Sequence, residues 1–299
     1  MARLKVALVQ LDAGSDVEAN LRTAVRLADQ AAAEGARLVA LPEYLQYRGS
    51  DDGYRASARP IPGPFTDAFA AVARARDAWI LAGSLAESDP AGSPDAQADE
   101  RPYNTSVLID PGGSIVARYR KIHLFDVDLE DGPSDRESER VSGGDRAVVA
   151  DVDGVRLGLS ICYDLRFPEL YRALAGAGAE VLAVPANFLE RTGRDHWEVL
   201  LRARAIENCA YVIAPAQVGS PAGVAAHGRS MIVDPWGTVI AKAADEVAIV
   251  HAELDLQRVA SIRRQIPVLA NRRPAALARI ERPAKVNERP AEQPPRGPR

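Results

Sequence analysis

Two stretches of this chain recur later in the sequence, and they recur in the same order. Residues 35–42 (GARLVALP) resemble residues 178–185 (GAEVLAVP), and residues 106–117 resemble residues 230–241, with an Asp-Pro-x-Gly turn in each. That turn between two apolar runs is a common hairpin signal by itself. Two recurring pairs in one order are difficult to attribute to chance, so we expect two structurally similar halves.

Apolar, β-favouring runs alternate with helical patterns along the chain, which favours an α/β architecture. Val6–Val9 and Leu38–Leu41 are typical of strands, and Ser15–Glu18 between them has the pattern of a capping box that opens a helix. The halves, about residues 1–150 and 151–270, are expected to pack sheet against sheet in one domain. Equivalent strand ends would then converge on one cleft across a pseudo-twofold axis.

Three segments lack the patterns of regular structure. Ser88–Pro102 and Asp126–Asp145 are polar and are predicted to be surface loops, the second of them over the cleft. The domain is expected to cover residues 1–275. Residues 276–299 are rich in Pro and Arg, and we expect this tail to be disordered or loosely attached.

Charge and cysteine content exclude several classes of protein. The formal net charge is −4 over 299 residues, which does not favour a nucleic-acid or membrane partner. No stretch approaches the roughly 20 apolar residues that cross a bilayer, and the N-terminus has no apolar signal core. Cys162 and Cys209 are too few for a disulfide framework. We therefore expect a cytoplasmic protein.

Cys162 lies where an apolar, strand-like run ends and a helix begins, with Pro168 near its first turn. A side chain at such an elbow projects into a cleft, and the backbone N–H groups behind it can face a developing negative charge. This position suits a thiol nucleophile. Cysteine is otherwise often a small buried apolar residue, which is our expectation for Cys209.

A thiol is only slightly ionised near neutral pH, so a cysteine nucleophile needs a base or a lowered pKa. None of the histidines lies in a sequence frame that recommends it as that base. Glu43, directly after Pro42 at an apolar strand end, is a candidate, because burial raises the pKa of a carboxyl group. The second half has Ala186 at the equivalent position. Lys121 could stabilise the oxyanion of a tetrahedral intermediate, with a backbone N–H just after Cys162.

Three motifs resemble those of the nitrilase, or carbon–nitrogen hydrolase, superfamily. They are Leu41-Pro42-Glu43, residues 119–126 (YRKIHLFD) and residues 162–169 (CYDLRFPE). Each motif is weak alone, but three in the right order, with further matches from Lys5 to about Pro274, are a strong signal. The chain looks most similar to the omega-amidase and deaminated-glutathione-amidase-like branch. The resemblance implies a four-layer α-β-β-α sandwich with an internal pseudo-twofold repeat.

The resemblance also implies roles by position. Glu43 would be the general base, Lys121 the oxyanion stabiliser and Cys162 the nucleophile. A second glutamate of the family falls at Glu137, with Glu139 as the neighbouring alternative. No metal or organic cofactor is implied, and since relatives commonly pair near the nucleophile helix, a homodimer is expected.

Substrate contacts are assigned with less support from the sequence. The candidates are Tyr163, Arg166, Asn187 and Phe188; the last two lie at a strand end that faces the presumed cleft. Arg166 and Asp164 either bind a substrate carboxylate or pair with each other at the helix start. The chain departs from close relatives at residues 226–230 (AHGRS), where they often have aromatic-Gly-His-Ser, and this leaves the accepted amide open.

The predicted function is hydrolysis of a small linear amide to an acid and ammonia through a thioester on Cys162. N-carbamoyl amino acid hydrolysis and nitrile hydrolysis are alternatives within the same chemistry. A binding or regulatory relative without turnover is the alternative from another class, and the intact Glu43, Lys121 and Cys162 argue against it. A papain-like Cys–His enzyme is less favoured, because His123 and His196 are expected to be structural.

Overall fold

A computed structural model of the protein describes residues 3–88, 101–130 and 134–277. Spatial contacts divide the chain into a unit of residues 1–269 and a second unit of residues 270–299, in which α7 (Pro274–Leu277) is the described helix. Most of the predicted loop Ser88–Pro102 and most of the predicted tail lie outside the described residues. The rest of this description concerns the first unit.

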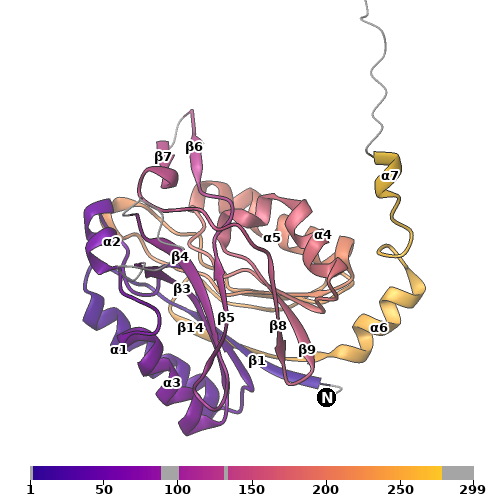
Figure 1. The fold of residues 1–299 in the computed structure, drawn as a ribbon, viewed down its shortest axis with the longest axis horizontal. Coiled ribbons are helices and arrows are strands. Elements are labelled where there is room, and N and C mark those ends of the chain that lie inside the picture. Colours follow the sequence, from indigo (N-terminus) through magenta and orange to yellow (C-terminus); the bar gives the residue numbers. More distant parts are fainter. Residues whose placement is uncertain (1–2, 89–100, 131–133, 278–299) are drawn as a thin grey trace, which may run out of the picture. The chain divides into compact units, whose positions relative to one another are not determined.

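The first sheet has six strands in the order β14-β1-β2-β3-β4-β5 (Figure 1). Strands β1, β2 and β3 run parallel, whereas β4 and β5 follow as antiparallel neighbours, and β14 pairs antiparallel with β1. The bounds are β1 (Arg3–Gln10), β2 (Leu38–Ala40), β3 (Trp79–Glu87), β4 (Tyr103–Ile109), β5 (Ile115–Arg120) and β14 (Ala248–Asp255).

The second sheet repeats this plan, with six strands in the order β13-β12-β11-β10-β9-β8. Strands β9, β10 and β11 are parallel, and β12 and β13 follow as antiparallel neighbours, so β9 to β13 match β1 to β5 in order and direction. The predicted internal repeat is confirmed. The bounds are β8 (Val148–Val152), β9 (Val155–Leu159), β10 (Val181–Ala183), β11 (Tyr211–Ala214), β12 (Met231–Val233) and β13 (Val239–Lys242).

Helices cover the outer face of each sheet (Figure 1). Helices α1 (Val17–Ala33) and α3 (Pro64–Arg76) contact the first sheet, and α4 (Pro168–Gly176) and α5 (Glu190–Asn208) contact the second. The inner faces of both sheets share one apolar core. The predicted four-layer α-β-β-α sandwich is confirmed.

Strand β1 shows why the sequences of the central strands are continuously apolar. Leu4, Val6 and Leu8 point into the core between the sheets, while Ala7 and Val9 point into the core beneath the helices. Because side chains alternate along a strand and both faces are buried here, every position of the run favours an apolar residue.

Two local predictions need correction. Helix α1 has Asp16 as its N-cap, whose side chain accepts the N–H of Ala19 at 2.9 Å, so the capping box predicted from Ser15 is wrong by one residue. The predicted loop Asp126–Asp145 is partly regular, since β6 (Asp126–Asp128) and β7 (Ser134–Arg136) form a hairpin followed by the 3₁₀ turn η1 (Glu137–Glu139). Polar side chains stabilise this hairpin: Asp128 pairs with Arg136 and accepts a hydrogen bond from Ser134.

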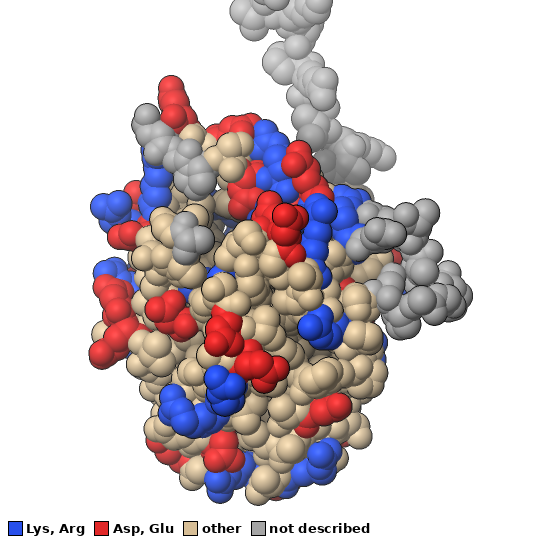
Figure 2. Space-filling view, turned by 90° about the vertical axis from the view of Figure 1, so that its left-hand side faces the viewer, with Lys and Arg blue, Asp and Glu red and all other residues tan. Residues whose placement is uncertain are grey.

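The remaining helices of this unit are α2 (Asp51–Ser57) and α6 (Leu256–Gln265), the latter directly after β14. Figure 2 shows acidic and basic side chains interspersed over one face of the molecule. In the described part of the chain, none of the helices combines the length and the apolar character that crossing a membrane requires.

Candidate active site

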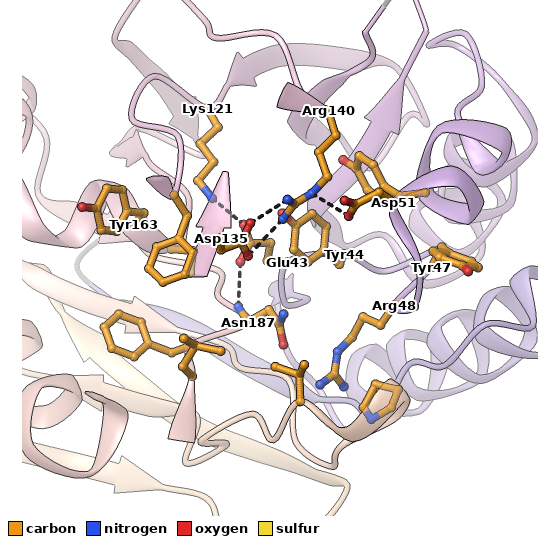
Figure 3. A pocket seen from close by; sticks show the side chains of 18 of the residues that line it. Glu43, Tyr44, Tyr47, Arg48, Asp51, Lys121, Asp135, Arg140, Tyr163 and Asn187 are labelled. Carbon is orange, nitrogen blue, oxygen red and sulfur yellow. Dashed lines mark hydrogen bonds and ion pairs between the residues drawn. The ribbon is translucent and has the colours of Figure 1, made fainter. Parts of the chain in front are cut away.

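A cavity of about 320 Å³ opens where the segments after β2, β5, β9 and β10 meet. Glu43, Lys121 and Cys162 all line it, although they are far apart in the sequence. Figure 3 shows Glu43 between Lys121 and Asn187 in the middle of this cavity. The expected convergence of strand ends from the two halves therefore brings the three residues together.

Cys162 begins the 3₁₀ turn η2 (Cys162–Arg166), which joins β9 to the Pro168 end of α4. Its φ of +47° lies in the left-handed region, which residues other than glycine seldom adopt. The backbone N–H of Cys162 donates to the carbonyl of Pro185 at 2.9 Å, after β10. This bond connects the strained residue to the neighbouring strand end.

The surroundings of the Cys162 thiol favour its protonated form. Burial raises its pKa well above the ordinary value, and the nearby Glu43 carboxylate raises it further by charge and hydrogen bonding. Lys121 acts in the opposite direction but does not outweigh these effects. Attack by the sulfur therefore requires a base that accepts the proton during the reaction.

Glu43 is buried, and donors hold both of its carboxylate oxygens. Oε1 accepts from Lys121 Nζ at 3.0 Å and from Asn104 Nδ2 at 3.0 Å. Oε2 accepts from the backbone N–H of Asn187 at 2.8 Å. These contacts fix the orientation of the carboxylate beside the Cys162 thiol, where it can serve as that base.

Lys121 is only 1% exposed and lies between two carboxylates. Its Nζ is 3.0 Å from Glu43 Oε1 and 2.8 Å from Glu137 Oε2. Burial alone would lower the pKa of Lys121, but the charges of Glu137 and Glu43 outweigh burial and raise it well above the ordinary value. The ammonium therefore stays charged, as an oxyanion stabiliser must.

Glu137, and not Glu139, is the second glutamate of this cluster. Burial would raise the pKa of Glu137, but Lys121 and the donors from Phe125 N–H (2.6 Å) and Tyr44 Oη (2.8 Å) lower it overall. Glu139 is exposed at the end of η1. The sequence left these two glutamates as alternatives because a loop fixes no register.

Two members of the cluster were missed by the sequence reasoning. Tyr44, which donates to Glu137, has a left-handed φ of +57°. Asn104, buried in β4, donates to Glu43 at 3.0 Å and to Glu137 at 3.4 Å. Asn104 is followed in β4 by Thr105 and Ser106, so its polar side chain does not stand out in the sequence, and nothing distinguishes Tyr44 either.

All four candidate substrate-binding residues line the cavity: Tyr163, Arg166, Asn187 and Phe188. The guanidinium carbon of Arg166 lies 5.1 Å from the centroid of the Phe188 ring, and its Nη1 is 3.2 Å from His196 Nδ1. Asp164 does not line the cavity. Its carboxylate is buried and occupied by other donors, so the proposed substrate or Arg166 contact of Asp164 is wrong.

The other cavity arginines already have partners. Arg140 binds Asp135 at 2.6 Å and Asp51 at 3.3 Å, and Arg48 donates to the carbonyl of Val218 at 2.7 Å. Figure 3 shows these two arginines on the side of the cavity opposite Tyr163. Arg166 is thus the cavity arginine for which the described residues supply no carboxylate.

The arrangement of these groups suits acyl transfer. The buried Cys162 thiol adjoins the fixed Glu43 carboxylate, and the Lys121 ammonium lies beside both. Within the described residues, no group of three or more His, Cys, Asp or Glu side chains is placed to hold a metal ion.

Comparisons with known proteins cover nearly the whole chain. Residues 5–264 match the model of a family described as carbon-nitrogen hydrolase. A deaminated glutathione amidase of Synechocystis sp. is 42% identical over 272 residues, which cover 89% of this chain and 97% of that protein. An omega-amidase of Bos taurus is 38% identical over 275 residues, which cover 91% and 96%. The crystal structure of the Caenorhabditis elegans NitFhit protein matches with a TM-score of 0.84 and 35% identity, over 92% of this chain and 66% of that chain.

The charge of Glu137 is expected to stabilise the fold in a pH-dependent way. Because the folded state lowers the pKa of Glu137, its contribution is complete above the ordinary carboxyl range and disappears as the pH falls through the lowered value. Glu137→Gln should lower the free energy of unfolding by about 3 kcal/mol at neutral pH. Urea denaturation should show the gap to wild type narrowing only below about pH 5.

Glu139→Gln is the matched control, since the same change at an exposed position should alter the free energy of unfolding by less than about 0.5 kcal/mol. This account would be contradicted if Glu137→Gln and the wild type had the same free energy of unfolding at pH 7, or if their difference persisted undiminished in acid.

Proposed function

Because the chain belongs to the carbon-nitrogen hydrolase family, we propose that Cys162, Glu43 and Lys121 are its catalytic residues and that Glu137 holds Lys121 in place. The family resemblance is confirmed, and the chain is a carbon–nitrogen hydrolase with amidases among its relatives. One observation carries the assignment of residues: the buried Glu43–Lys121–Glu137 cluster adjoins the Cys162 thiol in one cavity.

The first half-reaction forms a thioester. Glu43 accepts the thiol proton while the sulfur of Cys162 attacks the amide carbonyl, and the carbonyl electron pair moves onto oxygen. The Lys121 ammonium and the backbone N–H of Tyr163 stabilise this oxyanion. When the carbonyl re-forms, the C–N bond breaks, and Glu43 returns the proton to the nitrogen, which leaves as ammonia.

The second half-reaction releases the acid. Water takes the place of ammonia, and Glu43 accepts a proton from it as its oxygen attacks the thioester carbonyl. The second tetrahedral intermediate collapses with cleavage of the C–S bond, and the thiolate regains the proton from Glu43. The net reaction consumes one amide and one water and yields one carboxylic acid and one ammonia.

Glu137 is suited to holding Lys121 and not to moving protons. Its two oxygens accept hydrogen bonds from Lys121, Tyr44 and the Phe125 N–H, so no oxygen of Glu137 is left to face a substrate. Its negative charge also keeps the lysine protonated. We assign Glu137 as a positioning residue.

The substrate we propose is a small linear amide with a carboxylate at the end remote from the scissile bond. Arg166 supports this, since it lines the cavity and has no carboxylate partner among the described residues. The rings of Tyr163 and Phe188 supply an apolar wall for the intervening carbons, and the main chain of Asn187 fixes Glu43. A cavity of about 320 Å³ is of the size that takes a small molecule.

Replacing Cys162 should abolish turnover. Cys162→Ala is expected to lower ammonia release from an ω-monoamide of a dicarboxylic acid by about 10⁴-fold or more, because no other group can form the thioester. Cys209→Ala is the matched control, since Cys209 is buried away from the cavity and its thiol contacts backbone carbonyls of Ile206 and Ile266. Wild-type rates in Cys162→Ala would refute the proposed mechanism.

Arg166→Met tests the proposed carboxylate contact. It should raise KM for a monoamide with a terminal carboxylate by about 10- to 100-fold, because one charged hydrogen-bond donor is lost. A neutral amide of equal length should show little change in KM. Arg194→Met, at an exposed position of α5 outside the cavity lining, serves as control. Equal effects on the charged and neutral amides would rule out the contact.

We also propose that the protein is a homodimer that pairs through α5 and the β12–β13 turn. Val199, Ile206 and Trp236 expose 66%, 50% and 54% of their surface there. Arg202 on α5 donates to the carbonyl of Gly237 at 2.8 Å, which holds the helix and the turn together as one surface. Apolar side chains gathered in this way are typical of an interface.

The cytoplasmic location expected from the sequence stays a prediction.

Trp236→Glu should convert the dimer to a monomer, since a charge at the centre of an apolar interface lacks a partner. Sedimentation velocity at micromolar concentration would measure the change. Val116→Glu, an exposed apolar position on β5 in the other sheet, should leave the dimer intact. A monomeric wild type, or a dimeric Trp236→Glu, would overturn this assignment.

A further inference from the structure

A buried carboxylate outside the cavity connects the two halves of the catalytic machinery. We propose that Asp164 is a positioning residue that sets the separation between Lys121 and Cys162. The inference rests on the proposed function of those two residues. Asp164 is 0% exposed, lies two residues after Cys162 in η2, and does not line the cavity.

On the nucleophile side, Asp164 closes the turn that carries Cys162. Its Oδ2 accepts the backbone N–H of Ile161 at 2.8 Å, and its own N–H donates to the carbonyl of Ile161 at 3.0 Å. These two bonds bracket Cys162, whose left-handed φ the turn must maintain. The carboxylate therefore holds the backbone just before Cys162, and the main-chain bond of the same residue closes the turn after it.

On the lysine side, the same carboxylate binds residues on both sides of Lys121. Tyr119 Oη donates to Oδ2 at 2.7 Å, and His123 donates to Oδ1 from its backbone N–H at 3.1 Å and from Nδ1 at 2.7 Å. Because an ionised carboxylate only accepts hydrogen bonds, Nδ1 of His123 carries a proton. Lys121, midway between Tyr119 and His123, is thereby anchored to the turn of Cys162.

Packing around these hydrogen bonds further restricts the position of the η2 turn. The His123 ring stacks on the Phe167 ring, with centroids 3.7 Å apart and planes 7° from parallel. From the opposite side, Arg204 on α5 donates to the carbonyl of Leu165 at 3.0 and 2.8 Å, which holds the end of η2. The turn is therefore fixed by contacts from β5 and from α5.

The consequence for catalysis is geometric. Lys121 must meet the oxyanion that forms when Cys162 attacks, and a misplacement of about 1 Å can cost about 100-fold in rate. Asp164 touches no substrate in this arrangement. It acts through the two residues that do, and its loss should appear in kcat, while substrate binding at Arg166 is left unchanged.

Tyr119→Phe is the main test, because the ring stays packed in the core and only the hydroxyl is lost, with its 2.7 Å bond to Asp164 and the 3.3 Å bond that it accepts from the Ile122 N–H. We expect kcat to fall about 10-fold with KM within about twofold of wild type. Asp164→Asn should lower kcat by about 100-fold. The loss in the double variant should be clearly smaller than the product of the two single losses, since the shorter bond of the Tyr119 hydroxyl is the one to Asp164.

Tyr211→Phe is the matched control. Tyr211 is buried in β11 outside the cavity, and its hydroxyl donates to the carbonyl of Asp255 at 3.3 Å and accepts the N–H of Asp255 at 3.2 Å, so the change likewise removes one donated and one accepted hydrogen bond. Its melting temperature should also fall, though less than that of Tyr119→Phe because its bonds are longer and involve no charged group, and its kcat should be unchanged. Wild-type kcat in Tyr119→Phe despite a lowered melting temperature would overturn the proposal, as would multiplicative losses in the double variant.

The rate at which iodoacetamide alkylates Cys162, measured by mass spectrometry of the peptide that contains it, is a second test that requires no amide turnover. Lys121 lowers the pKa of the Cys162 thiol, so moving Lys121 away should shift the pH profile of alkylation upward in Tyr119→Phe and not in Tyr211→Phe. An unchanged profile would overturn the positioning role. Failure of the wild type to hydrolyse any amide would instead overturn the proposed function.

Discussion

The ammonium of Lys121 is buried, and the rest of the site depends on the two carboxylates that make this possible. An isolated buried ammonium is costly, and one paired carboxylate seldom offsets the loss of water. Here Glu43 and Glu137 both contact it at 3.0 and 2.8 Å, and donors from Tyr44, Asn104, Phe125 and Asn187 hold those carboxylates in turn. The cluster carries one more negative charge than positive, and the charge of Glu43 contributes to raising the pKa of the adjacent Cys162 thiol.

The internal repeat determines where this cluster lies in the fold, but it does not determine which side chains form it. Strands β2 and β10 are equivalent, and both end in proline at the cavity, but Glu43 follows one and Ala186 the other. The second half contributes the Cys162 turn and the Asn187 N–H instead. One active site therefore arises from two similar halves that carry different side chains at matching positions.

Much of the fold and the central residues of the site could be predicted from sequence. The recurring segments predicted the matching strand orders of the two sheets, and the three motifs predicted Glu43, Lys121 and Cys162. That these residues meet in one cavity could be expected because strand ends in a two-sheet fold converge. Contacts within irregular segments could not be predicted in this way. The choice between Glu137 and Glu139 depends on how a hairpin places one 3₁₀ turn. The role proposed for Asp164 depends on donors in β5 and just after it, 41 to 45 residues away. Such pairings follow from the tertiary structure and leave no local signal.

Strand β14 has a consequence for synthesis of the chain. It completes the first sheet beside β1, where Arg3 opposes Asp255, so the ends of the repeated region pair with each other. During translation β1 emerges first, and its open edge has no native neighbour on that side until residue 255 has been made. Exposed strand edges recruit other chains, and contacts so distant in sequence form slowly. The edge of β1 therefore stays open to pairing with other chains during the interval between emergence of β1 and of β14.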